Sequence, residues 1–445
     1  MANIGFVIMG AGRGTRMKSS LSKVMHSVAG LPMINHVLNA VGSLSPKTGC
    51  VVVGPHNQEE VKSVIGETNA VLQKDANGTA SAVGVCADFF KKEKVETIVI
   101  LNGDTPLINA ETITDLIDTR AEAGATIAIA GFLPQDPTGY GRIMVGDDEF
   151  VEAIVEDKEC DDDQRQVNLC YSGIMAVSAD KLFDLIDAVD NDNAKGEYYL
   201  TDIIKLAKAD GGNVAYTIAD ENEVMGCDSK MDLVTAEALF QYNMRMNALE
   251  NGTHLLAPET VYFSYDTKIG SDVTIEQNVV FGTGVEINDN CTIRAFSHLE
   301  KCIVGENSVV GPYARLRPGA VLEGNNKIGN FVEVKESKIG KGSKVNHLTY
   351  IGDTNMGKDC NIGAGVITCN YNGFEKTTTD MGDEVFVGSN TCLVSPVSVQ
   401  DGALIGAGSV VTKDVEKDAL VIARANQENV AGAAALFRKA KQKKK

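Results

Sequence analysis

Apolar residues recur at six-residue intervals through most of the second half of this chain, from Lys268 to about Thr412. The repeated residue is usually aliphatic, and glycine or another small residue usually follows it. Neither the 3.6-residue period of a helix nor the two-residue alternation of a strand produces this spacing. The repeated positions are Ile269, Ile275, Phe281, Ile287, Ile293, Val304, Val310, Leu316, Ile328, Val334, Ile339, Val345, Ile351, Met356, Ile362, Met381, Val387, Leu393, Val399, Ile405 and Val411.

A six-residue period predicts a parallel β-helix. Each unit is expected to supply one short strand and one corner, so the apolar side chains fill a narrow prism and three units complete one coil. The alternative is a Gly-rich run of surface loops, but six positions in phase from Met381 to Val411 are difficult to reach by chance. Glycine is expected where a side chain would crowd the turn. These glycines are Gly270, Gly305, Gly340, Gly363 and Gly388.

The first half has a different pattern, in which short apolar runs alternate with amphipathic stretches. Such alternation predicts βαβ units on a parallel or mixed sheet, with a nucleotide-sized ligand at the carboxyl ends of the strands. The expected fold class is therefore α/β, with a Rossmann-like domain followed by a β-helix. The predicted strands are Ile4–Met9, Cys50–Val53, Thr97–Leu101 and Thr126–Ala130.

A chain of 445 residues exceeds the usual size of one domain. Residues 229–251 are expected to form a connecting helix, because apolar residues recur there at helical spacing and Asn251-Gly252 supplies a C-terminal stop. These apolar residues are Met231, Val234, Ala238, Tyr242 and Leu249. We therefore expect a first domain over 1–228, the linker helix over 229–251, a β-helix domain over 252–424 and a tail over 425–445.

Composition excludes several classes of protein. A net charge of −19 disfavours nucleic acid as a general partner. The chain contains no long uncharged apolar run, so membrane insertion is not expected. No basic region or cleavage site accompanies the first apolar run, so a signal peptide is not expected either. The ten cysteines are scattered without a CxxC pair, which indicates reduced, mostly buried thiols rather than disulfides or zinc ligands. We expect a cytoplasmic protein whose basic last residues, Arg438 to Lys445, are a solvated terminus.

A Gly-rich loop, Gly10 to Met17, follows the first predicted strand. Its three glycines allow successive backbone N–H groups to face one anion, and Arg16 and Lys23 can neutralise a polyphosphate. A P-loop would need Gly-Lys-Ser/Thr at a fixed spacing, and a dinucleotide fingerprint would need glycine at Thr15, so both fit poorly.

The loop instead resembles the sugar-nucleotidyltransferase signature, and further segments occur in the order of that family. They are Gln73 with Gly78-Thr79, Asn102-Gly103-Asp104, Asp136 to Arg142, Val155 to Lys158, and Gly196 to Asp202. With the six-residue repeat, the chain up to about Arg424 resembles the bifunctional N-acetylglucosamine-1-phosphate uridylyltransferase and glucosamine-1-phosphate N-acetyltransferase family. The resemblance implies a nucleotidyltransferase domain, a left-handed coil and a role in UDP-N-acetylglucosamine biosynthesis for bacterial envelope polysaccharides.

The first reaction implied by the resemblance is attack of a sugar phosphate on UTP, assisted by Mg²⁺. Arg16 and Lys23 would act on the phosphates, and Asp104 and Asp228 would bind the metal. The residues implied to hold the nucleotide and the sugar are Met9, Gly10, Ala11, Gly12, Gln73, Gly78, Thr79, Asn102, Gly103, Gly141, Glu156 and Tyr171.

This chain departs from the family pattern at several of these positions. Ser22 replaces the family's proline, Asp228 replaces its asparagine, and Asn102 replaces its tyrosine. Tyr171 stands for an asparagine that contacts the sugar, and a phenol is larger than a carboxamide and offers one donor–acceptor group in place of two. Either Tyr171 fills part of the sugar pocket and weakens sugar-phosphate binding, or it packs while Asn168 or a water takes over the contact.

The second reaction implied by the resemblance is attack of the glucosamine-1-phosphate amine on acetyl-CoA. Histidine, with an ordinary pKa of about 6.5, suits a general base near neutral pH, and His347 lies in the family's His-Leu-Thr-Tyr motif. Glu333 could orient it. A loop between Ile367 and Met381 interrupts the repeat and can reach a neighbouring subunit, and the resemblance implies a homotrimer. The implied sugar-phosphate residues are Arg317, Lys335, Tyr350, Asn361 and Lys376, and the acetyl-CoA residues are Ala364, Asn370, Tyr371, Ser389, Ala407 and Arg424.

The expected function is thus acetylation of glucosamine-1-phosphate followed by uridylyl transfer from UTP, with pyrophosphate released. Two alternatives stay open at this point. One is a protein in which only the acetyl-transfer half is active, against which the set Arg16, Lys23, Asp104 and Glu156 argues. The other is a nucleotidyltransferase with a non-catalytic β-helix for assembly, against which His347 among several cations argues.

Overall fold

The computed structural model describes residues 3–66, 69–193 and 196–442. The chain forms two compact units, Met1–Asn243 and Met244–Lys445. Their boundary falls within α8 (Lys230–Glu250), a helix inside the range 229–251 expected to connect the halves. The functional domain limits at 228 and 252 stay predictions.

The first unit contains a nine-stranded mixed sheet. Its strands are β1 (Ile4–Met9), β4 (Thr48–Val53), β5 (Ala70–Leu72), β6 (Thr97–Asn102), β7 (Ile127–Phe132), β8 (Arg142–Val145), β9 (Val151–Val155), β10 (Cys170–Ser178) and β11 (Val214–Ile218). The main path runs β11-β7-β10-β6-β1-β4-β5. β1 pairs in parallel with β4 and β6, whereas β10 is antiparallel to β6 and β7. All four predicted strands are confirmed.

Both faces of this sheet are covered by helices. In β1 the side chains alternate, so Phe6 and Ile8 join one buried cluster and Val7 joins the other. The first cluster includes helices α1 (Met33–Ser43), α2 (Gln58–Ile65) and α5 (Ala110–Glu122), and the second includes α3 (Thr79–Gly84), α4 (Ala87–Phe90), α6 (Ala179–Asp187) and α7 (Ile203–Ala209). The small elements are η1 (Thr15–Met17), η2 (Lys23–Met25), β2 (Ser27–Val28), β3 (Leu31–Pro32), η4 (Gln164–Gln166) and η5 (Leu200–Asp202).

Helix α8 is confirmed, but the apolar stripe that indicated it does not form its buried face. Met231 is 80% exposed and Val234 is 70% exposed, whereas Ala236 and Ala248 are buried. Helical spacing therefore predicted the helix correctly, while the neighbouring elements decide which side of it is covered.

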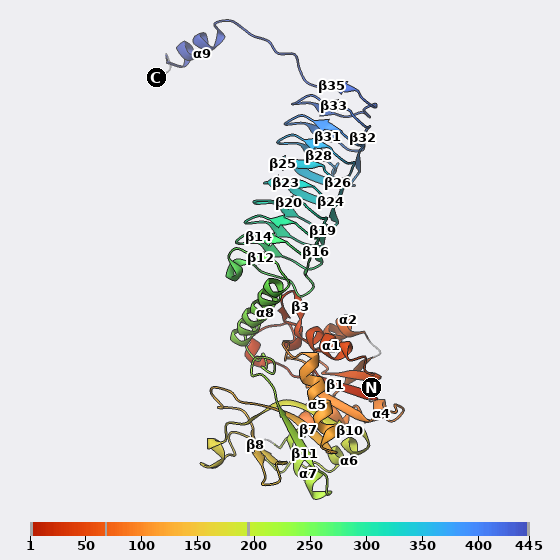
Figure 1. The fold of residues 1–445 in the computed structure, drawn as a ribbon, viewed down its shortest axis with the longest axis vertical. Helices are drawn as coiled ribbons and strands as arrows, with labels where there is room; N and C mark the ends of the chain where they lie inside the picture. Colours follow the sequence, from red (N-terminus) through yellow and green to blue (C-terminus); the bar gives the residue numbers. More distant parts are fainter. Residues whose placement is uncertain (1–2, 67–68, 194–195, 443–445) are drawn as a thin grey trace. The chain divides into compact units, whose positions relative to one another are not determined.

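The second unit is a parallel β-helix, whose short strands Figure 1 shows stacked coil upon coil. One ten-stranded sheet contains β12 (His254–Leu255), β14 (Thr274–Ile275), β17 (Thr292–Ile293), β20 (Val309–Val310), β23 (Lys327–Asn330), β25 (Lys344–His347), β27 (Asn361–Ile362), β30 (Phe386–Val387), β33 (Leu404–Ile405) and β35 (Leu420–Val421). A short helix, η6 (Pro258–Thr260), lies in the first coil.

A fourteen-stranded sheet supplies the other faces of the prism. Its strands are β13 (Lys268–Ile269), β15 (Val280–Phe281), β16 (Val285–Ile287), β18 (His298–Leu299), β19 (Cys302–Val304), β21 (Arg315–Leu316), β22 (Ala320–Leu322), β24 (Glu333–Ile339), β26 (Tyr350–Met356), β28 (Ile367–Cys369), β29 (Thr379–Met381), β31 (Cys392–Val394), β32 (Val397–Val399) and β34 (Val410–Val411). β24 pairs with β21 through its first residues and with β22 through its last, so it joins two faces.

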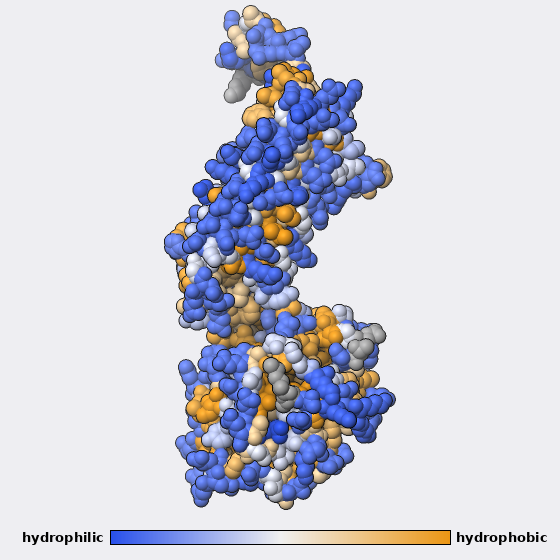
Figure 2. Space-filling view, turned by 45° about the vertical axis from the view of Figure 1, so that its right-hand side comes forward, coloured by the Kyte–Doolittle hydropathy of each residue, from blue (hydrophilic) through white to orange (hydrophobic). Residues whose placement is uncertain are grey.

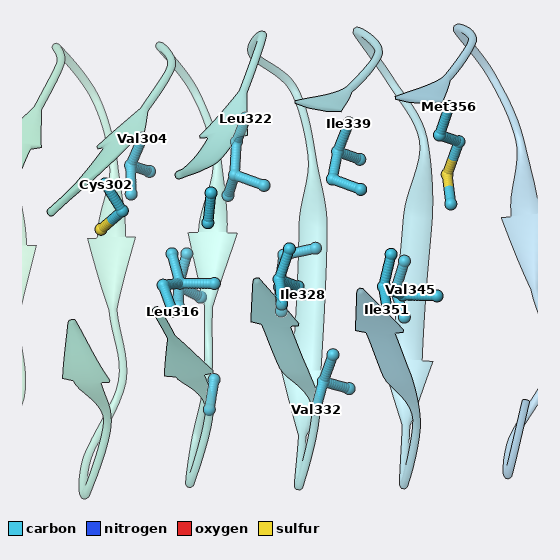
Figure 3. Close-up of a cluster of buried hydrophobic side chains, with 14 of the residues drawn as sticks. Cys302, Val304, Leu316, Leu322, Ile328, Val332, Ile339, Val345, Ile351 and Met356 are labelled. Carbon is cyan, nitrogen blue, oxygen red and sulfur yellow. The ribbon is translucent and has the colours of Figure 1, made fainter. Parts of the chain in front are cut away.

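The repeated apolar positions form one continuous core, as expected. All of them are buried except Ile269, which packs at the edge of the cluster. Side chains such as Leu316, Ile328 and Ile339 point inward from different strands of successive coils in Figure 3. Most backbone hydrogen bonds between adjacent coils join residues 15 to 19 positions apart, and 24 to 26 apart where the loop is inserted.

The glycines after the repeated residues are crowded by the next coil rather than by their own turn. A methyl group on Gly340 would lie 2.3 Å from the backbone carbonyl carbon of Gly357, one coil further along. The same conflict with backbone atoms of the next coil exists at Gly270, Gly305, Gly363 and Gly388. Glycine is therefore required at these positions by the stacking of coils.

The inserted loop leaves the prism after β28. Tyr371 and Lys376 form an isolated antiparallel bridge within it, and Phe374 is 97% exposed. After the last coil the chain continues to α9 (Ala433–Gln442), so the expected tail is described only to Gln442. Among the described helices, none is long and apolar enough to cross a membrane.

The stacking of coils predicts that Gly340→Ala destabilises the second unit. Because the added methyl group meets backbone atoms, the coils must separate, at a cost of about 1–3 kcal/mol. Gly406→Ala is the matched control: it has the same place in the repeat, but its methyl group would come no closer than 3.2 Å, to the Ile422 side chain. Thermal unfolding of the two variants checks this, and equal midpoints would contradict it.

Candidate functional site

A hollow of about 610 Å³ opens at the carboxyl ends of β1 and β6 in the first unit, where β10 also contributes to its wall. It brings together most residues predicted for the first site. Those that line it are Met9, Ala11, Gly12, Lys23, Gln73, Gly78, Thr79, Asn102, Asp104, Gly141, Glu156, Tyr171 and Asp228. Gly10, Gly103 and Arg16 do not line it.

Gly10 and Gly103 are structural rather than lining residues. Gly10 is buried and pairs through its N–H with the Val52 carbonyl at 2.9 Å, while the Gly103 N–H donates to the Met9 carbonyl at 2.9 Å. A methyl group on Gly103 would lie 3.0 Å from that same carbonyl. Both glycines therefore allow the close backbone packing that places their neighbours in the hollow.

The Gly-rich loop is anchored by Asn57, a residue that was not predicted. Its buried side chain donates to the Gly10 carbonyl at 2.8 Å and to the Ser22 hydroxyl at 3.0 Å. Ser22, which replaces the family's proline, also donates its N–H to Glu60 at 3.1 Å. No motif marks Asn57, because its role depends on the packing of α2 against the loop.

Lys23 lies at the centre of a charged cluster. Its ammonium contacts Asp104 and, at 3.0 Å, Asp228, and Arg16 bridges to Asp228 at 2.9 Å. Burial disfavours the charged ammonium, but the charges and hydrogen bonds of the two carboxylates outweigh it, so the pKa of Lys23 is raised. The two carboxylates thus converge on one cation.

Asp228 is positioned by the start of α8. The Asp232 carboxylate accepts from the N–H groups of Asp228 and Ser229 at 3.0 and 2.7 Å, and the Ser229 hydroxyl accepts from the Asp232 N–H at 3.3 Å. This reciprocal arrangement is a capping box. Its Ser-x-x-Asp spacing is a signal in the sequence that could have predicted both the helix start and the anchoring of Asp228.

One wall of the hollow is assembled from two distant segments. The Thr79 hydroxyl accepts from the Leu200 N–H at 2.9 Å, and a methyl group on Gly78 would lie 2.4 Å from the Tyr198 carbonyl oxygen. Gln73 donates to the Gly78 carbonyl at 3.3 Å. The segments that sequence reasoning grouped by resemblance are therefore in direct contact.

Tyr171 lines the hollow, and its hydroxyl group is buried. Among the described residues this hydroxyl has no hydrogen-bond partner. Burial, and then the nearby Glu156 carboxylate, raise the pKa of Tyr171 because both disfavour a phenolate. Asn168, the proposed substitute for the family's asparagine, is exposed and does not line the hollow.

In the second unit, His347 ends β25 and its Nδ1 lies 2.8 Å from the Oδ1 of Asn330 on the preceding coil. Glu333, which was expected to orient His347, pairs with Arg317 at 2.8 Å, and its role toward His347 stays a prediction. Asn330 was not predicted, although it and His347 each stand two residues after a repeated apolar position. The six-residue register alone could have placed them side by side.

Several predicted sugar-phosphate residues gather on the neighbouring face. The Lys376 ammonium lies close enough to Lys335 to lower the pKa of Lys335, and the Asn370 side chain reaches the Tyr350 hydroxyl at 3.4 Å. Two adjacent ammonium groups form a place where an anion would be favoured. Asn361 lies instead on the ten-stranded sheet, paired with Lys344, so a single chain does not bring it to this group.

Four of the predicted acetyl-CoA residues, Ala364, Ser389, Ala407 and Arg424, follow one edge of the prism, coil by coil, starting from His347. The N–H of Gly365 donates to the His347 carbonyl at 3.2 Å, and that of Asn390 donates to the Ala364 carbonyl at 2.8 Å. The next coil repeats the contact between Gly408 and Ser389 at 2.8 Å, and the Arg424 guanidinium donates to the Ala407 carbonyl. Tyr371 stands apart in the exposed loop.

Comparison with known proteins covers both units. Residues 6–176 match the MobA-like NTP transferase domain, residues 266–301 the bacterial transferase hexapeptide model and residues 380–413 the hexapeptide repeat of succinyl-transferase. These hexapeptide matches agree with the expected left-handed β-helix.

Similarity to curated proteins extends over nearly the full length of the chain. The bifunctional protein GlmU of Paramagnetospirillum magneticum is 47% identical over 98% of this chain and 97% of its own length. Those of Zymomonas mobilis and Agrobacterium fabrum are 44% identical over 98% of both chains, and 47% identical over 97% of this chain and 95% of the relative. The chain belongs to the family of bifunctional GlmU proteins.

Proposed function

We propose that this chain makes UDP-N-acetylglucosamine in two steps. It first transfers the acetyl group of acetyl-CoA to the amine of glucosamine-1-phosphate, and then transfers uridylyl from UTP to the product with release of pyrophosphate. The observation that carries the proposal is that one chain contains both sets of candidate site residues, one in each unit. The Lys23–Asp104–Asp228 cluster borders a nucleotide-sized hollow, and the β-helix carries both His347 and the adjacent side chains of Lys335 and Lys376.

In the uridylyl step, a phosphate oxygen of the sugar attacks the α-phosphorus of UTP and the bond to pyrophosphate breaks. The chain's role is to orient the two phosphates and to neutralise their charge. Lys23 lines the hollow, and Arg16 pairs with Asp228, which also lines it, so both supply positive charge there. Gln73 and Gly78 would contact the uracil, while Gly141, Glu156 and Tyr171 face the space proposed for the sugar.

Asp104 and Asp228 are the proposed ligands of Mg²⁺. Their oxygens converge on the Lys23 ammonium, so they fit a cation that takes one or two carboxylates and completes its shell with phosphate oxygens and water. When bound, Mg²⁺ supplies further charge neutralisation on the phosphates. Among the described residues no third acidic, histidine or cysteine side chain joins this pair, which accords with a site completed by substrate.

In the acetyl step, the amine nitrogen attacks the thioester carbonyl and loses a proton as coenzyme A leaves as its thiol. His347 is the proposed acceptor of that proton. Lys335 and Lys376 hold the sugar phosphate between two positive charges. The edge through Ala364, Ser389, Ala407 and Arg424 holds acetyl-CoA along the prism.

The two activities are tested separately by one assay that measures released thiol and released pyrophosphate. We expect His347→Ala to lower acetyl transfer by about two to four orders of magnitude, the usual contribution of a general base. Uridylyl transfer to N-acetylglucosamine-1-phosphate should be unchanged in this variant. Chelation of Mg²⁺ should abolish pyrophosphate release and spare thiol release, and Asp104→Ala should do the same.

Each outcome separates the two sites. Thiol release that survives His347→Ala would exclude the proposed base. Loss of thiol release on chelation would exclude a metal confined to the first site. Wild-type protein that yields only one of the two products would support a chain with one active half.

We further propose a homotrimer with acetyl-transfer sites between neighbouring prisms. The rings of Phe296, Tyr313 and Phe331 stack on successive coils, with centroids 4.8 and 5.2 Å apart, and each is about half exposed. In Figure 2, patches of hydrophobic residues interrupt the hydrophilic surface of the prism. A second copy could cover such residues, and could also bring Asn361 to the lysine pair.

Light scattering should therefore give a mass near three chains. Dilution or mutation that releases monomers should abolish acetyl transfer, because the site is incomplete in one copy. A monomer with full acetyl-transfer activity would rule out shared sites.

The proposed location is the cytoplasm. All ten cysteines are free, and eight of them are buried. Reduced thiols in this number suit a reducing compartment.

Tyr171 should limit binding of the sugar phosphate. We expect Tyr171→Asn to lower the Michaelis constant for N-acetylglucosamine-1-phosphate about tenfold, because a hydrogen-bonding amide replaces a bulky group and contributes about 1–3 kcal/mol. The constant for UTP should change little. Steady-state kinetics check this, with Tyr171→Phe as the control that removes only the unpartnered hydroxyl. Equal sugar-phosphate constants in wild type and Tyr171→Asn would mean that Tyr171 only packs.

A further inference from the structure

The neighbour of His347 in this chain is an amide rather than a carboxylate. The two residues end the consecutive strands β23 and β25 and are paired in register, so the contact follows from the stacking of coils. The distance of 2.8 Å between the imidazole Nδ1 and the Asn330 Oδ1 is that of a good hydrogen bond. Asn330 is half-buried, whereas His347 is exposed.

This contact determines which imidazole nitrogen carries the proton. A carboxamide oxygen can only accept a hydrogen bond, so Nδ1 must donate. In a neutral imidazole one nitrogen is a donor and the other an acceptor. The lone pair therefore resides on Nε2, the nitrogen that points away from Asn330 and is available for a substrate proton.

Tyr313 and Asn346 also line the hollow around His347, but among the described residues Asn330 is the side chain within hydrogen-bond distance of the imidazole. Glu333 is engaged with Arg317. The hollow of about 570 Å³ that contains both His347 and Asn330 is lined by three cationic side chains, Arg294, Lys327 and Lys344. Cations donate hydrogen bonds and cannot accept one from Nδ1.

We propose that Asn330 is a positioning residue that fixes His347 in the tautomer required of the base in acetyl transfer. The inference rests on the proposed acetyl-transfer function and adds a specific residue to it. Without an acceptor at position 330, the imidazole can rotate and exchange tautomers, so only part of the protein presents Nε2 as a base in the productive orientation.

The test compares Asn330→Ala and Asn330→Asp in the full-length protein, with glucosamine-1-phosphate and acetyl-CoA as substrates. In Asn330→Ala, kcat for acetyl transfer should fall about 10- to 100-fold, less than the loss of the base itself. The KM for glucosamine-1-phosphate should stay within about threefold, because the sugar phosphate is held elsewhere.

Asn330→Asp keeps an acceptor for Nδ1 and adds a negative charge. It should retain more activity than Asn330→Ala, and the acid limb of its kcat/KM profile should move to higher pH by about one unit, since a carboxylate favours the imidazolium. Arg294, Lys327 and Lys344 are present in every variant, so this movement reports the added carboxylate alone. The shift shows that position 330 faces the catalytic imidazole, and the higher kcat of Asn330→Asp over Asn330→Ala shows that an acceptor there is what acetyl transfer requires.

Asn355→Ala is the matched control. It removes an exposed asparagine of the same prism whose side chain donates to Asp380 at 2.8 Å, away from His347. Its kcat and pH profile should equal those of the wild type. Light scattering and thermal unfolding identify any variant that fails to fold.

The possible results are distinct. A normal kcat in Asn330→Ala, or an unshifted acid limb in folded Asn330→Asp, would overturn the role of Asn330. If Asn330→Ala fails to fold, the profile of Asn330→Asp decides alone. Wild-type protein without acetyl transfer would instead refute the proposed function, and this inference with it.

Discussion

The constraint on which the second unit depends is the backbone hydrogen bonding between successive coils, which fixes every residue directly above its counterpart in the coil before. It excludes side chains after the repeated residues, as at Gly340, because the backbone of the next coil occupies that space. It also aligns exposed positions, so that Asn330 meets His347 and the rings of Phe296, Tyr313 and Phe331 stack. The register that stacks the apolar side chains of the core therefore also brings together the functional side chains on the surface.

The first unit uses a different principle, in which opposite charges hold the site together before any substrate binds. Lys23 is only 14% exposed and would be costly to bury alone. Asp104 and Asp228 offset that cost, and the capping box at Ser229 and Asp232 keeps Asp228 in place. The carboxylates are therefore already converged when phosphates arrive.

The repeat and the strand pattern predicted both folds, since periodicity reports directly which side chains face a core. The hollow was also largely predicted, residue by residue, from resemblance. The failures have a common cause: they depend on contacts that local spacing does not encode. The stripe containing Met231 indicated a helix but not its buried side, and Asn57 acts only through the packing of α2. Glu333 was assigned to His347, but its carboxylate pairs with Arg317, and the side chain against the imidazole is that of Asn330.

The edge that begins at His347 gains one contact with each added coil and ends at Arg424. If acetyl-CoA binds along this edge as proposed, the number of coils beyond the histidine sets the length of ligand that can lie against it, whereas in a globular pocket the shape of the cavity sets that limit. An extended molecule with its reactive group at one end suits such a surface. Loops can be inserted at the corners without altering this length, as the segment carrying Phe374 demonstrates, because the register resumes at β29.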